Sequence, residues 1–274
     1  MRRIGVATLI ASALPATLAA QAVLIAPQAV VVDRGQRAGT FTVVNIGEDR
    51  VEVDLSTLYG VPVTDSAGNL LLDTQTPITD STPSAADWIE MFPRRFALEP
   101  GARRTVRLLV RPPDGVPERE YWARLVVASR ATPRVAPVAA VEAVNVAITL
   151  EVRSVFPFLF RKGTVATALE LGEPTAVRGA DSITVRVPLT RRGNAAWVGT
   201  LRATVEDRSG RVVRETELPL GVYHTLHPRL VLPAADLPDQ DYLIRIEAVG
   251  RRNDLPTSFV LPTAPVRRVV ELRR

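Results

Sequence analysis

The chain has 274 residues, a formal net charge of +5 and no cysteine. Without cysteine the fold must rest on hydrophobic cores alone, and so modest a charge does not favour nucleic acid as a partner. Hydrophobic residues make up 46% of the chain and aromatic residues 5%, with 22 prolines and 16 glycines. This composition favours many short strands joined by turns over long helices.

The first 22 residues have the pattern of a signal peptide. Arg2 and Arg3 precede an apolar run over residues 4–18, and Ala20-Gln21-Ala22 follows the A-x-A pattern of a cleavage site. A membrane anchor is the alternative, which the shortness of the apolar run disfavours. We therefore expect residues 1–22 to be removed on export to a bacterial periplasm, the exterior or a secretory lumen.

The segments that follow alternate between apolar and polar residues at a period of two, which predicts β-strands. Turn residues separate them, and the Ser-Ala-Gly-Asn sequence at 66–69 predicts a hairpin. The strands expected in this half of the chain span residues 24–32, 39–45, 51–58, 88–96, 104–110, 120–129 and 142–160. Such regular spacing is typical of an antiparallel sandwich.

The stretch from 142 to 160 is the longest of these and lies near the middle of the chain. Its apolar row consists of Val144, Val146, Ile148, Leu150 and Val152, and the alternation resumes at Phe156. We expect this strand to complete the first domain and to lead into a second. The row either faces the core of its own domain or is offered to a partner, and its exposure to solvent separates the two interpretations.

After Arg161-Lys162-Gly163, which we interpret as a hinge, the strand pattern restarts. The strands expected here span residues 164–171, 182–189, 196–206, 211–218, 229–232, 242–249, 257–261 and 266–272. The sequence thus predicts an all-β fold of two tandem immunoglobulin-like β-sandwich domains, with boundaries at 23–162 and 163–274.

Motifs of catalysis and of metal or cofactor binding are not found in the sequence. His224 and His227 are three residues apart, but neither cysteine nor a nearby carboxylate pair accompanies them, so a loop position is the simpler interpretation. Nucleophile elbows, phosphate-binding glycine loops and zinc-protease helices do not occur either. We expect no catalytic residues, no metal and no cofactor, and a protein that is not an enzyme.

Several segments resemble the N-terminal domain of the periplasmic pilus chaperones. The most telling is FPRRFALEPGARRTVRLLV at residues 92–110. Val44-Asn45, the Glu-Tyr-Trp sequence that begins at residue 120 and the Phe-Leu-Phe-Arg sequence at 158–161 are similar as well. The resemblance covers about residues 23–165, and the second half shows only a weak likeness around Gly193-Asn194 and Asp241-Tyr242.

The resemblance implies a periplasmic chaperone whose two domains form a boomerang. In that family the strand called G1 lends alternating apolar residues to a pilus subunit that lacks a strand, a form of β-augmentation. The subunit-binding residues would be Val144, Val146, Ile148, Leu150 and Val152. The partners would be pilus, fimbrial or similar secreted β-subunits, with an outer-membrane usher and a self-capping homodimer as further partners.

Two positions depart from the family pattern. The family holds the terminal carboxylate of its subunit with an arginine in the first strand and a lysine in G1, and Ala29 and Pro157 stand at those positions here. An interdomain salt bridge is better preserved: Arg161 would pair with Glu120 (or Glu118) and Asp241. The alternative function is a cell-surface or pilus-accessory tandem immunoglobulin-like binding module without chaperone activity.

Overall fold

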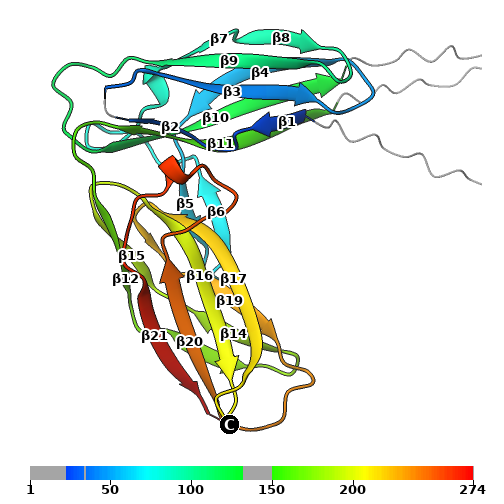
Figure 1. Ribbon diagram of the computed structural model, residues 1–274, viewed down its shortest axis with the longest axis vertical. Coiled ribbons are helices and arrows are strands. Elements are labelled where there is room, and N and C mark those ends of the chain that lie inside the picture. The colour runs from blue at the N-terminus through cyan, green and yellow to red at the C-terminus, as the bar shows by residue number, and fades with distance from the viewer. Residues whose placement is uncertain (1–22, 34, 132–149, 274) are drawn as a thin grey trace, which may run out of the picture.

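Two β-sandwiches make up the protein in this computed structural model, which describes residues 23–33, 35–131 and 150–273. Their long axes meet at an angle, so the molecule is bent (Figure 1). The elements of the first sandwich are β1 (Val23–Ala26), β2 (Val30–Asp33), β3 (Ala38–Asn45), β4 (Val51–Leu58), β5 (Val61–Thr64), β6 (Leu70–Asp73), η1 (Ala86–Trp88), β7 (Ile89–Phe92), β8 (Arg95–Leu98), β9 (Arg103–Val110), β10 (Glu120–Ala131) and β11 (Glu151–Arg161).

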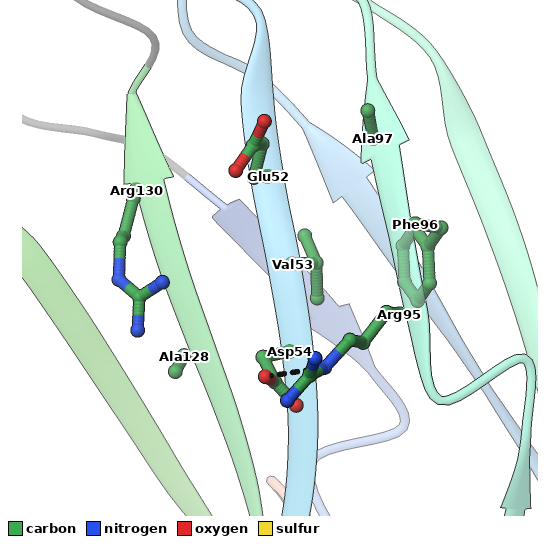
Figure 2. Close-up of a pocket in the computed structure, with 8 residues that line it drawn as sticks. All are labelled: Glu52, Val53, Asp54, Arg95, Phe96, Ala97, Ala128 and Arg130. Atoms are coloured by element: carbon green, nitrogen blue, oxygen red, sulfur yellow. Dashed lines mark ion pairs between the residues drawn. The ribbon is translucent and has the colours of Figure 1, made fainter.

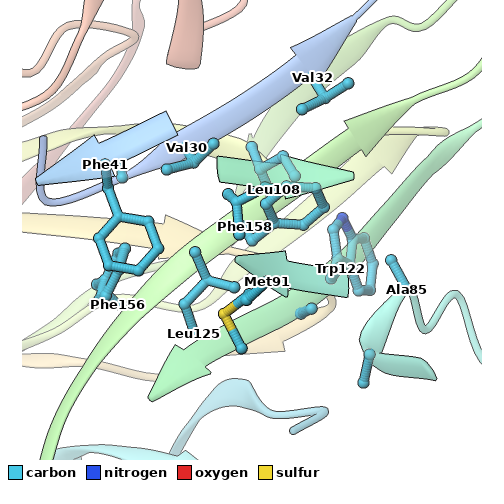
Figure 3. Packing of buried hydrophobic residues seen from close by; sticks show 14 of the residues in the cluster. Val30, Val32, Phe41, Ala85, Met91, Leu108, Trp122, Leu125, Phe156 and Phe158 are labelled. Atoms are coloured by element: carbon cyan, nitrogen blue, oxygen red, sulfur yellow. The ribbon is translucent and has the colours of Figure 1, made fainter. Parts of the chain in front are cut away.

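The first sandwich packs a sheet of order β1-β3-β9-β7 on a sheet of order β2-β11-β10-β4-β8. Alternation at period two decides which side chains enter the core, because successive residues of a strand point to opposite faces. In β4, for example, Val51, Val53 and Leu55 are buried. Figure 3 shows the centre of this core, where Phe41 of β3 meets Phe156 of β11 edge to face, with ring centroids 5.2 Å apart.

Two prolines transfer the chain from one sheet of this sandwich to the other. The first expected strand, 24–32, is divided near Pro27 into β1 and β2, which belong to different sheets. The expected strand 88–96 is likewise divided at Pro93 into β7 and β8. Proline has no amide hydrogen to give to a ladder, so a strand that meets one readily leaves its sheet.

The second sandwich has a sheet of order β17-β16-β20-β21 on one side and two short sheets, β12-β15-β18 and β13-β14-β19, on the other. Its elements are β12 (Thr167–Leu171), β13 (Thr175–Arg178), β14 (Ser182–Arg186), β15 (Leu189–Gly193), β16 (Trp197–Glu206), β17 (Val212–Val222), β18 (Thr225–Leu226), β19 (Arg229–Pro233), β20 (Tyr242–Val249), η2 (Thr257–Phe259) and β21 (Val266–Leu272).

Prolines also explain why one layer of the second sandwich consists of two sheets. Pro174 lies between β12 and β13, Pro188 between β14 and β15, and Pro228 between β18 and β19. All three breaks fall at the junction of the two short sheets. The expected strand 182–189 is therefore two strands, and the strand expected at 257–261 is wrong, since that segment contains the short helix η2.

Both sandwiches share a feature of immunoglobulin-like domains, the tyrosine corner. Tyr121 at the start of β10 donates a hydrogen bond from its hydroxyl to the carbonyl oxygen of Pro117 at 2.8 Å. Tyr242 at the start of β20 makes the same bond to Pro238, also at 2.8 Å. A tyrosine that reaches back to the chain just before its own strand is typical of this fold. The predicted pair of tandem immunoglobulin-like sandwiches is thereby confirmed.

The hairpin of β5 and β6 leaves the first sandwich and lies against the second (Figure 1). Arg229 donates its backbone amide hydrogen to the carbonyl of Gly68 at 3.0 Å, and Arg186 donates from Nη1 to the carbonyl of Ser66 at 3.0 Å. His227 donates its amide hydrogen to the hydroxyl of Thr64 at 3.0 Å, and Leu70 packs on the second core. The chain thus connects its two sandwiches both at the hinge and through this hairpin.

None of the helices in the described part of the chain has the length and apolar character that a membrane span needs.

Candidate functional site

The predicted donor strand enters the structure as β11, which pairs along its whole length with β10, from Glu120↔Arg161 to Arg130↔Glu151. On its other side β11 pairs with β2 only over the segment from Phe158 to Arg161. Within the described ranges, residues 151–157 therefore have one edge that no strand occupies. An unpaired edge presents its backbone donors and acceptors to any further strand of suitable length.

Side chains of β11 alternate between the core and the surface. Phe156 and Phe158 are buried in the core of the first sandwich, whereas Val155, which directly precedes Phe156, is 42% exposed. Leu150 and Val152 share the face of Phe156 because they follow at intervals of two. Val152 is half-buried and Leu150 is 51% exposed, so the apolar row becomes more exposed as it leaves the core.

The structure describes two of the five predicted subunit-binding residues. Leu150 and Val152 are placed as above, whereas Val144, Val146 and Ile148 lie outside the described residues. The assignment of a subunit-binding role to this row stays a prediction. Pro157 does not interrupt the strand, since β11 runs through it opposite Arg124. Its position in the half of β11 without a second neighbour is one where sheets accept proline.

A charged cluster marks the start of β11. Glu151 accepts hydrogen bonds from Arg130 Nε of β10 and from Arg153 Nε, each at 2.5 Å. The hydrogen bonds from Arg153 and Arg130 hold the pKa of Glu151 below its ordinary value. Charged side chains at the end of an open strand are a common defence against unselective pairing of sheets.

A polar groove runs beside this cluster on the outer face of the sheet (Figure 2). It has a volume of about 470 Å³ and is lined by Glu52, Val53, Asp54, Arg95, Phe96, Ala97, Ala128 and Arg130. Arg95 and Asp54 form an ion pair across it at 2.8 Å. The groove therefore offers charges of both signs over β10, β4 and β8, on the side of β10 that is away from β11.

The hinge contains a buried ion pair at one end of the β10–β11 pairing. Arg161 Nε donates to Glu120 Oε2 at 2.9 Å, and both side chains are almost wholly excluded from solvent. Arg161 also donates from Nη1 and Nη2 to the carbonyls of Ser258 and Phe259, at 2.7 and 2.8 Å. Arg161 thus joins the last strand of the first sandwich to the η2 segment of the second.

Glu120 makes matching contacts on its other oxygen. Its Oε1 accepts hydrogen bonds from the indole of Trp122 and from the backbone amide of Ala196, both at 2.9 Å. The carboxylate of Glu120 thus accepts hydrogen bonds from Arg161 and Trp122 of the first domain and from Ala196 of the second. Buried charges are tolerated when they are paired and hydrogen-bonded in this way.

Asp241 does not take part in this hinge, contrary to the sequence-based expectation. It pairs with Arg208 at 2.9 Å at the start of β20, where both side chains are exposed. Asp241 precedes Tyr242 as Glu120 precedes Tyr121, so the two acids occupy equivalent positions in different sandwiches. β20 begins at the end of the second sandwich that is farther from the first (Figure 1). Glu118 lies near the hinge, where the backbone amide of Thr164 donates to it at 3.3 Å.

A further hinge residue, Asn194, escaped the sequence analysis. Its amide donates to the carbonyl of Thr164 at 3.0 Å and its side-chain oxygen accepts from the amide of Ala166 at 2.8 Å. The carbonyl of Asn194 accepts from the amide of Glu120 at 3.0 Å. The Gly193-Asn194 sequence was the available signal, because a glycine followed by asparagine often marks a tight turn.

The positions where the pilus chaperones carry their carboxylate anchor hold no charge here. Ala29 is buried between β1 and β2, and Pro157 lies in β11. His224 and His227 lie at opposite ends of β18, and the described residues contain no group of three histidines or carboxylates that could hold a metal ion.

Comparisons with known proteins found likeness in structure alone. No family model and no curated protein matches the sequence. The chain is similar to the YadV chaperone, at 11% identity over 91% of this chain and 99% of that one, with a TM-score of 0.45. It is also similar to the Pseudomonas aeruginosa CupB2 chaperone (13%, 91% and 99%, TM-score 0.44). The Salmonella enterica SafB chaperone, solved with the SafA pilin, is a third (15%, 91% and 97%, TM-score 0.42).

Proposed function

We propose that this protein is a periplasmic chaperone that stabilises pilus, fimbrial or similar secreted β-subunits by lending them the strand that ends in β11. The observation that carries the proposal is the edge of β11 at residues 151–157, which no strand of the described residues occupies and which is continuous with the apolar row at Val152 and Leu150. A subunit short of one strand would pair with this edge through its backbone and take the row into its core.

The proposal includes the route by which the chain reaches its partner. Residues 1–22 would be removed on export, and the domains would be 23–162 and 163–274. An outer-membrane usher would then receive the loaded subunit. In the free protein a self-capping homodimer would cover the row, since exposed apolar edges invite association.

The hinge supports this proposal by fixing the surface that a subunit would meet. Because Arg161 and Glu120 are bonded to both sandwiches, the outer face of β10 and β11 is held at a set angle to the second domain. Binding to a prepared surface costs less conformational entropy than binding to a mobile one.

The first test compares Leu150→Glu with Leu71→Glu in capture of periplasmic proteins. The two leucines are 51% and 53% exposed, so each change places a charge at a similarly accessible site. We expect the native protein and Leu71→Glu to recover small β-rich subunits, and Leu150→Glu to fold normally and recover none. Unfolding of Leu150→Glu would instead place the row in the protein's own core.

The second test follows hydrogen exchange of the recovered complex. If a subunit pairs with the open edge, the backbone amides of residues 151–157 that point toward it are protected from exchange. If the subunit binds through another surface, the exchange rates of these amides stay unchanged. Equal capture by both glutamate variants, together with unchanged exchange, would favour the tandem binding module without chaperone activity.

A further inference from the structure

Arginines gather where the two sandwiches meet. Arg119, Arg124 and Arg161 come from the first domain and Arg191 from β15 of the second. Glu120 pairs with Arg161, and none of the other three arginines takes part in an ion pair with a described carboxylate. The junction therefore carries a surplus of positive charge in a place largely withdrawn from water.

Arg124 is the most deeply placed of the three. It is 7% exposed, its Nε donates to the carbonyl of Gly60 at 2.9 Å, and its guanidinium lies 5.1 Å from the ring centroid of Tyr223. Its Nη2 is buried and has no hydrogen-bond partner among the residues that the structure describes. A buried donor on a charged group that finds no acceptor is costly, so an acceptor from outside the chain would stabilise it.

Arg191 of the second domain packs on the ring of Trp122, which touches that of Tyr223. Its Nε donates to the carbonyl of Tyr223 at 2.6 Å, its Nη1 donates to the carbonyl of Gly193, and its guanidinium lies 5.7 Å from the ring of Trp122. The rings of Trp122 and Tyr223 are in contact, with centroids 4.8 Å apart. The guanidinium groups of Arg124 and Arg191 thus lie on two touching aromatic rings.

Arg119 adds a third charge and a second unmet donor. Its Nε is buried, and within the described ranges it has no hydrogen-bond partner. Burial, followed by the charge of Arg119, lowers the pKa of Arg191, and only Glu120 acts in the opposite direction. Like charges in a place of low dielectric repel strongly, and an anion between them would remove that repulsion.

We propose that a small tetrahedral oxyanion, such as phosphate or sulfate, binds between Arg119, Arg124 and Arg191 and bridges the two domains. Guanidinium groups present paired N–H donors whose geometry matches such oxygens, which a single lysine would not. Because the donors come from both sandwiches, the anion stabilises the bent arrangement. The site is independent of the chaperone activity proposed above.

Isothermal titration calorimetry of the full-length protein with sodium sulfate tests this site, with sodium chloride at equal ionic strength as the reference. Arg191→Gln removes one of the three arginines of the site. Arg192→Gln is the matched control, since Arg192 is the next residue of β15 but is exposed and pairs with Glu170. We expect Arg191→Gln to weaken sulfate binding by about tenfold or more, and Arg192→Gln to leave it unchanged.

Tryptophan fluorescence gives a second readout, because the ring of Trp122 lies under Arg191. Sulfate should change the emission of the native protein and of Arg192→Gln but not that of Arg191→Gln. If Arg191→Gln fails to fold, Arg191→Lys keeps the charge but loses the paired donors, and weaker binding is still expected. Equal weakening in both glutamine variants, or no specific effect of sulfate over chloride, would overturn the proposal.

Discussion

Glu120, the first residue of β10, faces Arg161, the last residue of β11, and each makes hydrogen bonds to the second domain. The pair is at once the end of a ladder and the centre of the hinge. Its burial makes each partner depend on the other, because either charge alone would be left without compensation.

Removal of both partners should therefore cost less than the sum of the two single removals. We expect Glu120→Gln and Arg161→Met each to lower the free energy of unfolding by about 3–5 kcal/mol. The double variant should lose less than the sum of the two, because no lone charge stays buried. Urea denaturation of the three variants measures the coupling, and strict additivity would mean that the two charges do not interact.

A methyl group at Gly68 should weaken the contact between the β5–β6 hairpin and the second sandwich. This residue has φ +84°, and a Cβ there would lie 3.1 Å from the backbone nitrogen of Arg229. Gly210 has φ +82° with open space around it, so Gly210→Ala has the backbone strain without the collision. We expect Gly68→Ala to be the less stable by about 1 kcal/mol or more, and to increase the radius of gyration in small-angle scattering. Equal effects of the two changes would show that the hairpin contact is dispensable.

The two tyrosine corners predict equal losses in both domains. Tyr121→Phe and Tyr242→Phe each remove one hydroxyl that donates to a proline carbonyl at 2.8 Å. Each change should lower the free energy of unfolding by about 1 kcal/mol, the usual contribution of such a bond. Chemical denaturation measures both losses. A loss in one domain alone would mean that the hydroxyl of the other domain bonds to water in the unfolded chain as well as it bonds to the carbonyl in the folded protein.

His224 should report on the arginines around it. Burial, with the charges of Arg191 and Arg119, lowers the pKa of His224. Because folding lowers this pKa, the unfolded chain binds more protons below about pH 6.5. The contribution of His224 to stability is then complete above that pH and is lost as the pH falls toward the folded-state pKa.

Proton NMR titration checks this prediction, with a His227→Gln variant to assign the signals. Arg191→Gln should raise the pKa of His224, since one repelling charge is removed. A pKa that does not change in Arg191→Gln would contradict the placement of the two side chains.

Much of the fold could be predicted from local pattern, since β4, β9 and β20 lie close to the ranges expected for them. Prolines were less well anticipated: Pro93 and Pro188 each divide a strand that its apolar residues alone suggested would continue. The segment 257–261 ends in three consecutive apolar residues, yet it packs on the first domain through η2, with Phe259 buried in that core. Tertiary contacts overrode its β propensity.

Only those contacts of the candidate site that lie within one domain could be predicted from the sequence. Glu120 and Arg161 end neighbouring strands, so their meeting follows from the pairing of β10 with β11. Asp241 was expected at the hinge from the resemblance alone, and it pairs with Arg208 of its own sandwich instead. The approach of Arg191 to Trp122 joins residues of different domains, and no pattern within either segment indicates it.

The hairpin that reaches the second sandwich also sets an order in folding. Residues 61–73 dock on Arg186 and Arg229, which come much later in the sequence. Until the second sandwich forms, Leu70 has no second core to pack on. The first sandwich can therefore form before its hairpin is docked, and the bent shape is complete only when the second sandwich has folded.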